Sequence, residues 1–141
     1  MKRNTLVVFG LVVSLNLVSL PALADVVVVM GINSPVTTLT REQVTDIYLG
    51  KVRELPTGGI AAPTMVGGTP AKDEFFSRVI GKSDSEIRAI WARMTFTGKG
   101  VAPRELKDAA EVKKMLASNP RALGFIDRSA LDSSVKVVYA P

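Results

Sequence analysis

The sequence contains no cysteine and no histidine among its 141 residues. The absence of cysteine excludes disulfide bonds, thiolate metal sites and cysteine nucleophiles. The absence of histidine removes the usual general base and the commonest metal ligand. Asp73 and Glu74 are adjacent in an expected helix, so they point to different faces and do not form an acid/base pair. We therefore expect a protein that is not an enzyme and that holds neither a metal ion nor a cofactor.

Residues 1–24 have the pattern of a secretory signal peptide. Lys2 and Arg3 form a charged start, residues 6–20 form an apolar run without a charge, and a small-x-small pattern ends at Ala24. The alternative is an uncleaved membrane anchor, but the run is shorter than the about 20 residues of a membrane span. We expect export to the periplasm after cleavage near Ala24.

The remaining chain, residues 25–141, has the length of a single domain. Cleavage would remove two of the 18 basic residues and none of the 13 acidic ones, so the net charge would fall from +5 to +3 (16 − 13). This small positive excess favours small anions, acidic partners or envelope surfaces as ligands, and it does not indicate nucleic acid.

Strand-like and helix-like segments alternate along residues 25–141. Apolar and β-branched runs predict strands over residues 26–30, 60–66, 121–126 and 135–139. Helix-start signals lie between them, at Thr40 with Gln43, at Ser83 with Glu86 and at Asp108 with Glu111. This order predicts an α/β domain with a layered, mostly parallel sheet of about four strands and flanking helices. Ligands of such sheets bind beyond the carboxyl ends of the strands, where we expect both the loop after residue 30 and the turn after residue 66.

The stretch from Gly67 to Phe76 leads from the second strand into a helix. Thr69 is placed as the N-cap, and Pro70 follows at the first helical position. Gly68 lets the backbone approach a ligand closely, and the first amides of the helix, which have no partner inside it, favour a bound anion. The Lys72 side chain would add a cation. The alternative is a turn that binds nothing, with Lys72 as a solvated surface charge.

A second cationic stretch runs from Phe96 to Gly100, with Lys99 between two glycines. Arg93 lies nearby in the sequence. Lys99 and Arg93 could form a second wall of the anion pocket or a patch that docks a protein. The alternative is a solvated surface loop.

Four segments carry a resemblance to a known family. Residues 40–51 (TREQVTDIYLGK) are similar to the segment "L-[ST]-x-x-Q/E-L-x-x-I-[FY]-x-G-K". Residues 66–69 lie where the family has a Gly-Ser-Gly-Thr anion loop. Residues 122–126 are similar to the segment "G-A-I-G-Y-V". Residues 91–100 are similar to "W-x-R-x-x-F-T-G-[KR]-G" in short exported relatives. In this order the segments resemble PstS-type phosphate-binding proteins of ABC transporters. The resemblance implies one lobe of the type 2 periplasmic-binding-protein fold, with phosphate or a similar small oxyanion bound by Gly68, Thr69, Ala71 and Lys72.

The sequence departs from this family at the anion loop itself. The Arg and Asp before the loop correspond to Met65 and Gly67, the second Gly to Pro70 and the Thr to Ala71. The bidentate clamp that an Arg provides is therefore missing.

Two functions remain open. The first is an exported solute-binding-like protein that recognises an oxyanion, alone or as half of a homodimer, and is related to ABC phosphate uptake. The second is a periplasmic interaction or sensor-docking module. Such a module would have lost tight anion binding and would contact a membrane transporter or sensor through the loop around Lys99.

Overall fold

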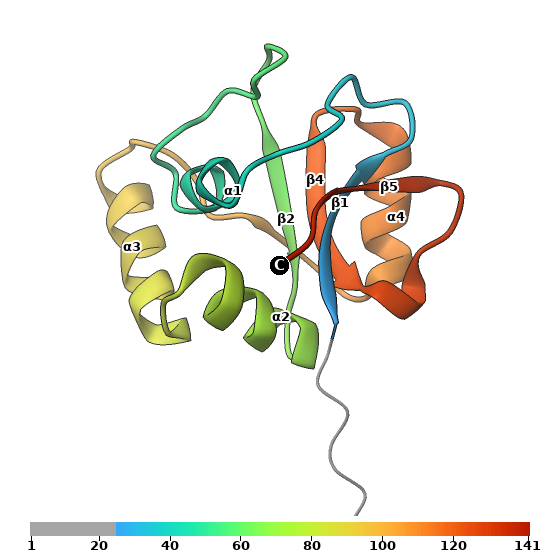
Figure 1. Ribbon diagram of the computed structural model, residues 1–141. Helices are drawn as coiled ribbons and strands as arrows, with labels where there is room; N and C mark the ends of the chain where they lie inside the picture. The colour runs from blue at the N-terminus through green and yellow to red at the C-terminus, as the bar shows by residue number, and fades with distance from the viewer. Residues whose placement is uncertain (1–24) are drawn as a thin grey trace, which may run out of the picture.

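The computed structural model describes residues 25–141, and the expected signal peptide lies outside them. These residues form a five-stranded sheet with helices on both faces (Figure 1). The strands are β1 (Val26–Gly31), β2 (Ala62–Val66), β3 (Arg104–Leu106), β4 (Ala122–Asp127) and β5 (Val135–Tyr139). The helices are α1 (Arg41–Tyr48), α2 (Pro70–Glu74), α3 (Asp84–Phe96) and α4 (Ala109–Ser118), with a π-helical segment η1 (Phe75–Ile80) and a 3-10 turn η2 (Arg128–Ala130). Among these helices, none is long and apolar enough to cross a membrane.

The sheet has the order β3-β2-β4-β1-β5. Strand β2 pairs in parallel with β3 and β4, whereas β1 runs antiparallel to both β4 and β5. The expected α/β class is confirmed, and the structure adds β3 to the four strands that the sequence predicted. The reversed direction of β1 corrects one expectation. Met30, near the end of β1, lies opposite Leu123 near the start of β4, and β2 runs in the same direction as β4. The loop after β1 and the turn after β2 are therefore at opposite ends of the strands.

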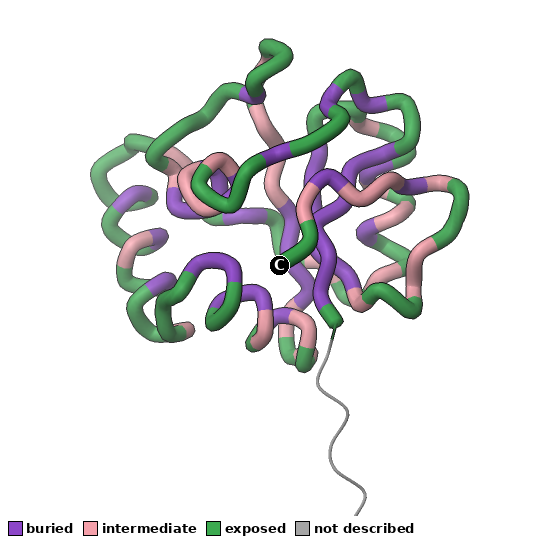
Figure 2. The backbone as a smooth tube through the Cα atoms, in the orientation of Figure 1, coloured by how far each residue is buried: buried purple, intermediate pink, exposed green. Residues whose placement is uncertain are grey.

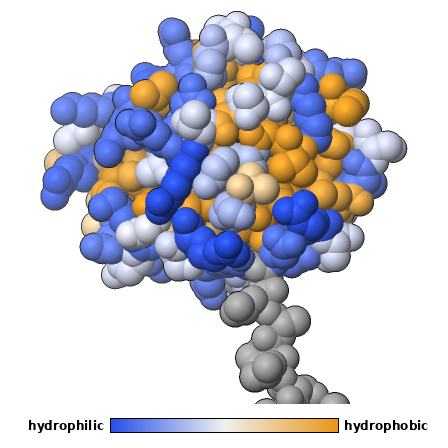
Figure 3. All heavy atoms as spheres, in the orientation of Figure 1, coloured by the Kyte–Doolittle hydropathy of each residue, from blue (hydrophilic) through white to orange (hydrophobic). Residues whose placement is uncertain are grey.

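Strand β1 forms the centre of the core. Its residues from Val26 to Met30 are fully buried (Figure 2), as a continuous β-branched run predicts for a strand covered on both faces. Val26, Val28 and Met30 pack on the side of α1, α2, η1 and α3, while Val27 and Val29 pack on the side of α4. On the outside, apolar surface reaches the solvent between hydrophilic groups (Figure 3).

The helices begin where the sequence predicted. Thr40 and Ser83 form complete capping boxes with Gln43 and Glu86, and the Asp108 carboxylate accepts the Glu111 N–H. These side chains satisfy N–H groups that have no partner inside the helix. The π-helical continuation of α2 was not predicted. It ends as expected at Gly81, whose φ of 73° is the left-handed conformation that glycine adopts readily.

Candidate functional site

The turn between β2 and α2 has the geometry that its sequence predicts. Gly68 adopts a positive φ of 65°, which glycine tolerates because it has no Cβ. Thr69 is the N-cap of α2, and its hydroxyl oxygen accepts the Lys72 N–H at 3.3 Å. Pro70 follows at the first helical position. The chain therefore leaves the buried end of β2 and enters α2 with its first amides directed outward from the helix end.

This turn borders a cleft of about 220 Å³ at the carboxyl edge of the sheet. Thr69 and Ala71 line one side of the cleft, and Asp108 and Ala109 at the start of α4 line another. In the described part of the chain, the N–H groups of Gly68 and Ala71 have no hydrogen-bond acceptor, and Ala71 lines the cleft whereas Gly68 does not. The cleft therefore has a backbone donor of α2 available to a ligand.

Lys72 lies elsewhere. Its Nζ is 2.8 Å from Oδ1 of Asp84 and 5.4 Å from the centre of the Phe76 ring, and the residue is only 7% exposed. The ammonium group is therefore directed toward the start of α3, and Lys72 does not line the cleft. Of the four residues expected to hold an anion, the structure brings Gly68, Thr69 and Ala71 together at the turn and pairs the fourth with a carboxylate.

Acidic side chains that the sequence did not single out border the same cleft. These are Asp108 and Asp127. Outside the lining, Glu105 packs so closely over Gly67 that a Cβ at position 67 would lie 2.0 Å from its Oε1. Hydrogen bonds from the Ser129 hydroxyl and N–H hold the pKa of Asp127 below its usual range. Asp127 is therefore ionised at neutral pH, and it accepts hydrogen bonds but donates none.

Arg93 and Lys99 are separate from this cleft. Together they line a second cleft of about 210 Å³ beside the end of α1. Strand β3 is parallel to β2 and begins opposite Thr64, so the loop that precedes β3 lies toward the amino end of β2. Gly68 follows the carboxyl end of β2. The expectation that Lys99 or Arg93 forms a second wall of the same anion pocket is therefore wrong, because the parallel pairing holds the two regions apart.

Neither a protein-family model nor a curated protein sequence matches the chain. Its fold does match solved structures. An ABC-type phosphate transport receptor from Vibrio cholerae is 23% identical, with a TM-score of 0.61 over 82% of this chain and 45% of the receptor. A phosphate ABC transporter substrate-binding protein with bound phosphate from Clostridium perfringens is 22% identical, with a TM-score of 0.63 over 82% of this chain and 44% of that protein.

The chain has the fold of half a phosphate-transport binding protein. PstS from Borrelia burgdorferi shows the same relation, with a TM-score of 0.56 over 74% of this chain and 41% of its own length. The resemblance seen in the sequence is thus confirmed at the level of fold, and the chain spans less than half the length of the proteins it matches. The first two are named as a transport receptor and a substrate-binding protein, and none of the three is named as an enzyme.

Proposed function

We propose that this chain is an exported, single-domain, solute-binding-like protein that recognises phosphate or a similar small oxyanion. The observation that carries the proposal is the Ala71 N–H at the start of α2, which belongs to the lining of the cleft and has no hydrogen-bond acceptor among the described residues. Backbone N–H groups at the start of a helix attract anions because they are unpaired and carry the positive end of the helix dipole. The fold supports the proposal, since a structure with this fold holds phosphate.

The acids around the cleft restrict the form of the ligand. Asp108 and Asp127 line the space in which the anion would lie, and two like charges in close contact repel each other. An oxyanion that still carries a proton can donate a hydrogen bond to a carboxylate, whereas a fully deprotonated one cannot. We therefore expect monobasic phosphate to bind and sulfate to be rejected.

A single lobe also leaves the ligand partly in water. Contacts between charges are weak where solvent screens them, so one copy of the chain would bind an oxyanion with low affinity. Cover from a second copy or from another protein would exclude water and strengthen each hydrogen bond. The proposed ligand would then be shared between the α2 turn and a partner surface.

Calorimetric titration of the exported chain tests the proposal. Phosphate, sulfate and chloride are titrated at low ionic strength, first near pH 6 and then near pH 8. We expect saturable heat with phosphate that weakens as the pH rises, because phosphate loses the proton that it would donate to the acidic side of the cleft. Sulfate and chloride should give no saturable heat.

Two substitutions at Ala71 locate the site. Ala71→Glu places a carboxylate at the helix start, where it suits the helix dipole, and it should weaken phosphate binding at least about tenfold by repulsion. Because Ala71 packs against the core, circular dichroism first checks that the variant is folded. Ala71→Ser is the matched control, because it keeps a small, uncharged side chain and the backbone amide. The proposal fails if folded wild-type protein gives no heat with phosphate, or if Ala71→Glu leaves the titration unchanged.

A further inference from the structure

A third cleft lies beside the amino end of β2 and adjoins the second one, since Gly50, Met94 and Lys99 line both. It has a volume of about 270 Å³ and is bordered by α1, by the loop that leads into β2 and by the loop between α3 and β3. Ala62 and Pro63 are part of its wall, because β3 begins to pair with β2 only at Thr64. The uncovered start of β2 is therefore accessible from outside.

Exposed apolar side chains concentrate around this cleft. The described residues expose five large apolar side chains, and Val52 (44%), Ile60 (51%) and Val101 (79%) all line the cleft. Phe96, which is 93% exposed, ends α3 two residues after Met94, another residue of the lining. Exposed apolar groups that gather in one place mark an interaction site, whereas scattered ones do not.

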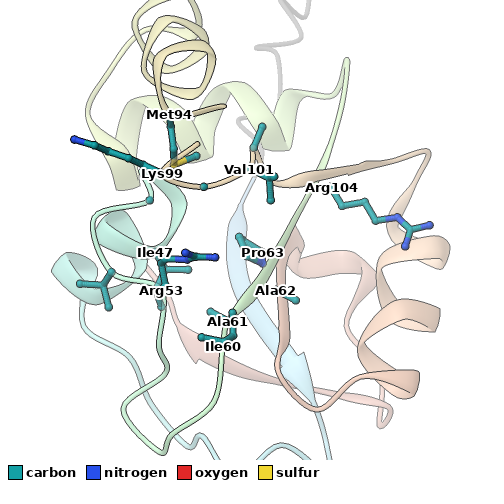
Figure 4. A pocket seen from close by; sticks show the side chains of 14 residues that line it. Ile47, Arg53, Ile60, Ala61, Ala62, Pro63, Met94, Lys99, Val101 and Arg104 are labelled. Atoms are coloured by element: carbon teal, nitrogen blue, oxygen red, sulfur yellow. The ribbon is translucent and has the colours of Figure 1, made fainter. Parts of the chain in front are cut away.

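The charged side chains of the same cleft are all cations. Arg53, Lys99 and Arg104 line it, and no acidic residue does. Within residues 25–141, none of the three forms a salt bridge. Figure 4 shows Arg53 directed across the cleft toward Pro63, while Lys99 and Arg104 extend outward on opposite sides. The positive charge therefore surrounds an apolar floor and does not converge on one point.

We propose that this cleft docks an acidic segment of a protein partner, one that alternates carboxylates with apolar side chains. The apolar side chains pack against Val52, Ile60 and Val101, and the carboxylates pair with the three cations. Protein interfaces commonly combine an apolar centre with arginine and a charged rim. The divergent cations fit an extended chain with several carboxylates better than one small anion.

Charge repulsion also excludes a two-fold contact of this cleft with the same cleft of a second copy. In a two-fold symmetric contact the same patch meets itself, so Arg53, Lys99 and Arg104 would face cations of the other copy. The proposal concerns a different region from the α2 turn and holds whether or not the chain binds phosphate.

The test uses a short, fluorescently labelled synthetic peptide in which glutamate alternates with leucine. Anisotropy titration of the exported chain should give saturable binding that weakens with added salt, because salt screens the paired charges. Peptides that alternate lysine with leucine, or glutamate with serine, should bind at least about tenfold more weakly, since each lacks one of the two interactions.

Substitutions in the cleft and matched changes elsewhere locate the binding. The double variant Arg53→Glu with Arg104→Glu should weaken the peptide at least about tenfold, while Lys114→Glu on the exposed side of α4 should change it less than about twofold. Val101→Ser should weaken binding, and Ile32→Ser should not. Ile32 is also an exposed apolar residue, but it lies beside the loop that leads into β5.

Three results would overturn the proposal. One is the absence of saturable peptide binding by folded protein. Another is binding that Lys114→Glu reduces as much as the cleft variants do, which would indicate attraction by overall charge. The third is stronger binding to phosphatidylglycerol vesicles that the cleft variants abolish, which would assign the surface to a membrane. Ala71→Glu should leave peptide binding intact, which separates this test from the phosphate titration.

Discussion

Lys72 and Asp84 form an ion pair of 2.8 Å that joins the start of α2 to the start of α3. The Lys72 side chain is 9% exposed, whereas that of Asp84 is 43% exposed. Asp84 also contacts Arg88 through its second oxygen, at 2.6 Å. The buried cation therefore depends on a carboxylate that reaches it from the surface, and this pair holds the two helices together.

Asp84→Asn should lower the thermal midpoint more than Arg88→Gln. The first substitution leaves the Lys72 ammonium buried without a counter-charge, which is costly, while the second removes only an exposed pair within one helix, which contributes little. Thermal unfolding followed by circular dichroism measures both. Equal effects would show that Lys72 finds water or another partner.

The same pair predicts a dependence on acid pH. Hydrogen bonding from Lys72, helped by Arg88, holds the pKa of Asp84 below its usual range. Its contribution to stability is present above the unfolded pKa of about 3.9 and is lost as the pH falls through the lower folded pKa. The stability difference between wild type and Asp84→Asn should therefore shrink in acid. Urea unfolding at neutral pH and near pH 3 measures this difference.

Tyr48→Phe should destabilise the fold by about 1–2 kcal/mol. The Tyr48 hydroxyl is fully buried and donates to the Thr64 carbonyl oxygen at 2.7 Å. Burial also raises the pKa of the Tyr48 phenol. Its stabilisation is present below the unfolded pKa of about 10 and is lost as the pH rises above it. The difference between wild type and Tyr48→Phe should thus decrease in urea unfolding above that pH, and a constant difference would contradict the assignment.

Gly124→Ala should destabilise the fold by about 1–3 kcal/mol through overpacking. A Cβ at this position would lie 2.7 Å from Thr64 Oγ1 and 2.7 Å from Val112 Cγ1, between β2 and α4. Val112→Ala removes one of the two atoms, so the double variant should lose less stability than the sum of the single variants. If the two losses of stability in urea unfolding are additive, the contact with Val112 of α4 does not cause the overpacking at position 124.

Phe96→Ala should change stability by less than about 0.5 kcal/mol, because Phe96 is 93% exposed. The matched control is Phe76→Ala, which removes a ring that is 3% exposed and should cost about 3–5 kcal/mol. A large loss of stability in Phe96→Ala would show that this side chain packs onto the domain and is not free to meet a partner.

Much of the local structure could be read from the sequence. Thr40, Ser83 and Asp108 begin helices because a side-chain oxygen at an N-cap accepts an N–H only two or three residues away. Thr69 begins α2 for the same reason, and Gly68 before it adopts the positive φ that glycine tolerates. Strand β3 was missed, since three residues with an exposed arginine and glutamate carry no apolar pattern.

The sequence by itself determined the helix starts, the buried strands and the resemblance to phosphate-binding proteins, because these depend on neighbouring residues. Only the tertiary structure decided the direction of β1, the pairing of Lys72 with Asp84 and the gathering of Arg53, Lys99 and Arg104 around one cleft. Each of these joins residues that are distant in the chain. Strand pairing and helix packing bring them together, and no local pattern records which side chains will meet.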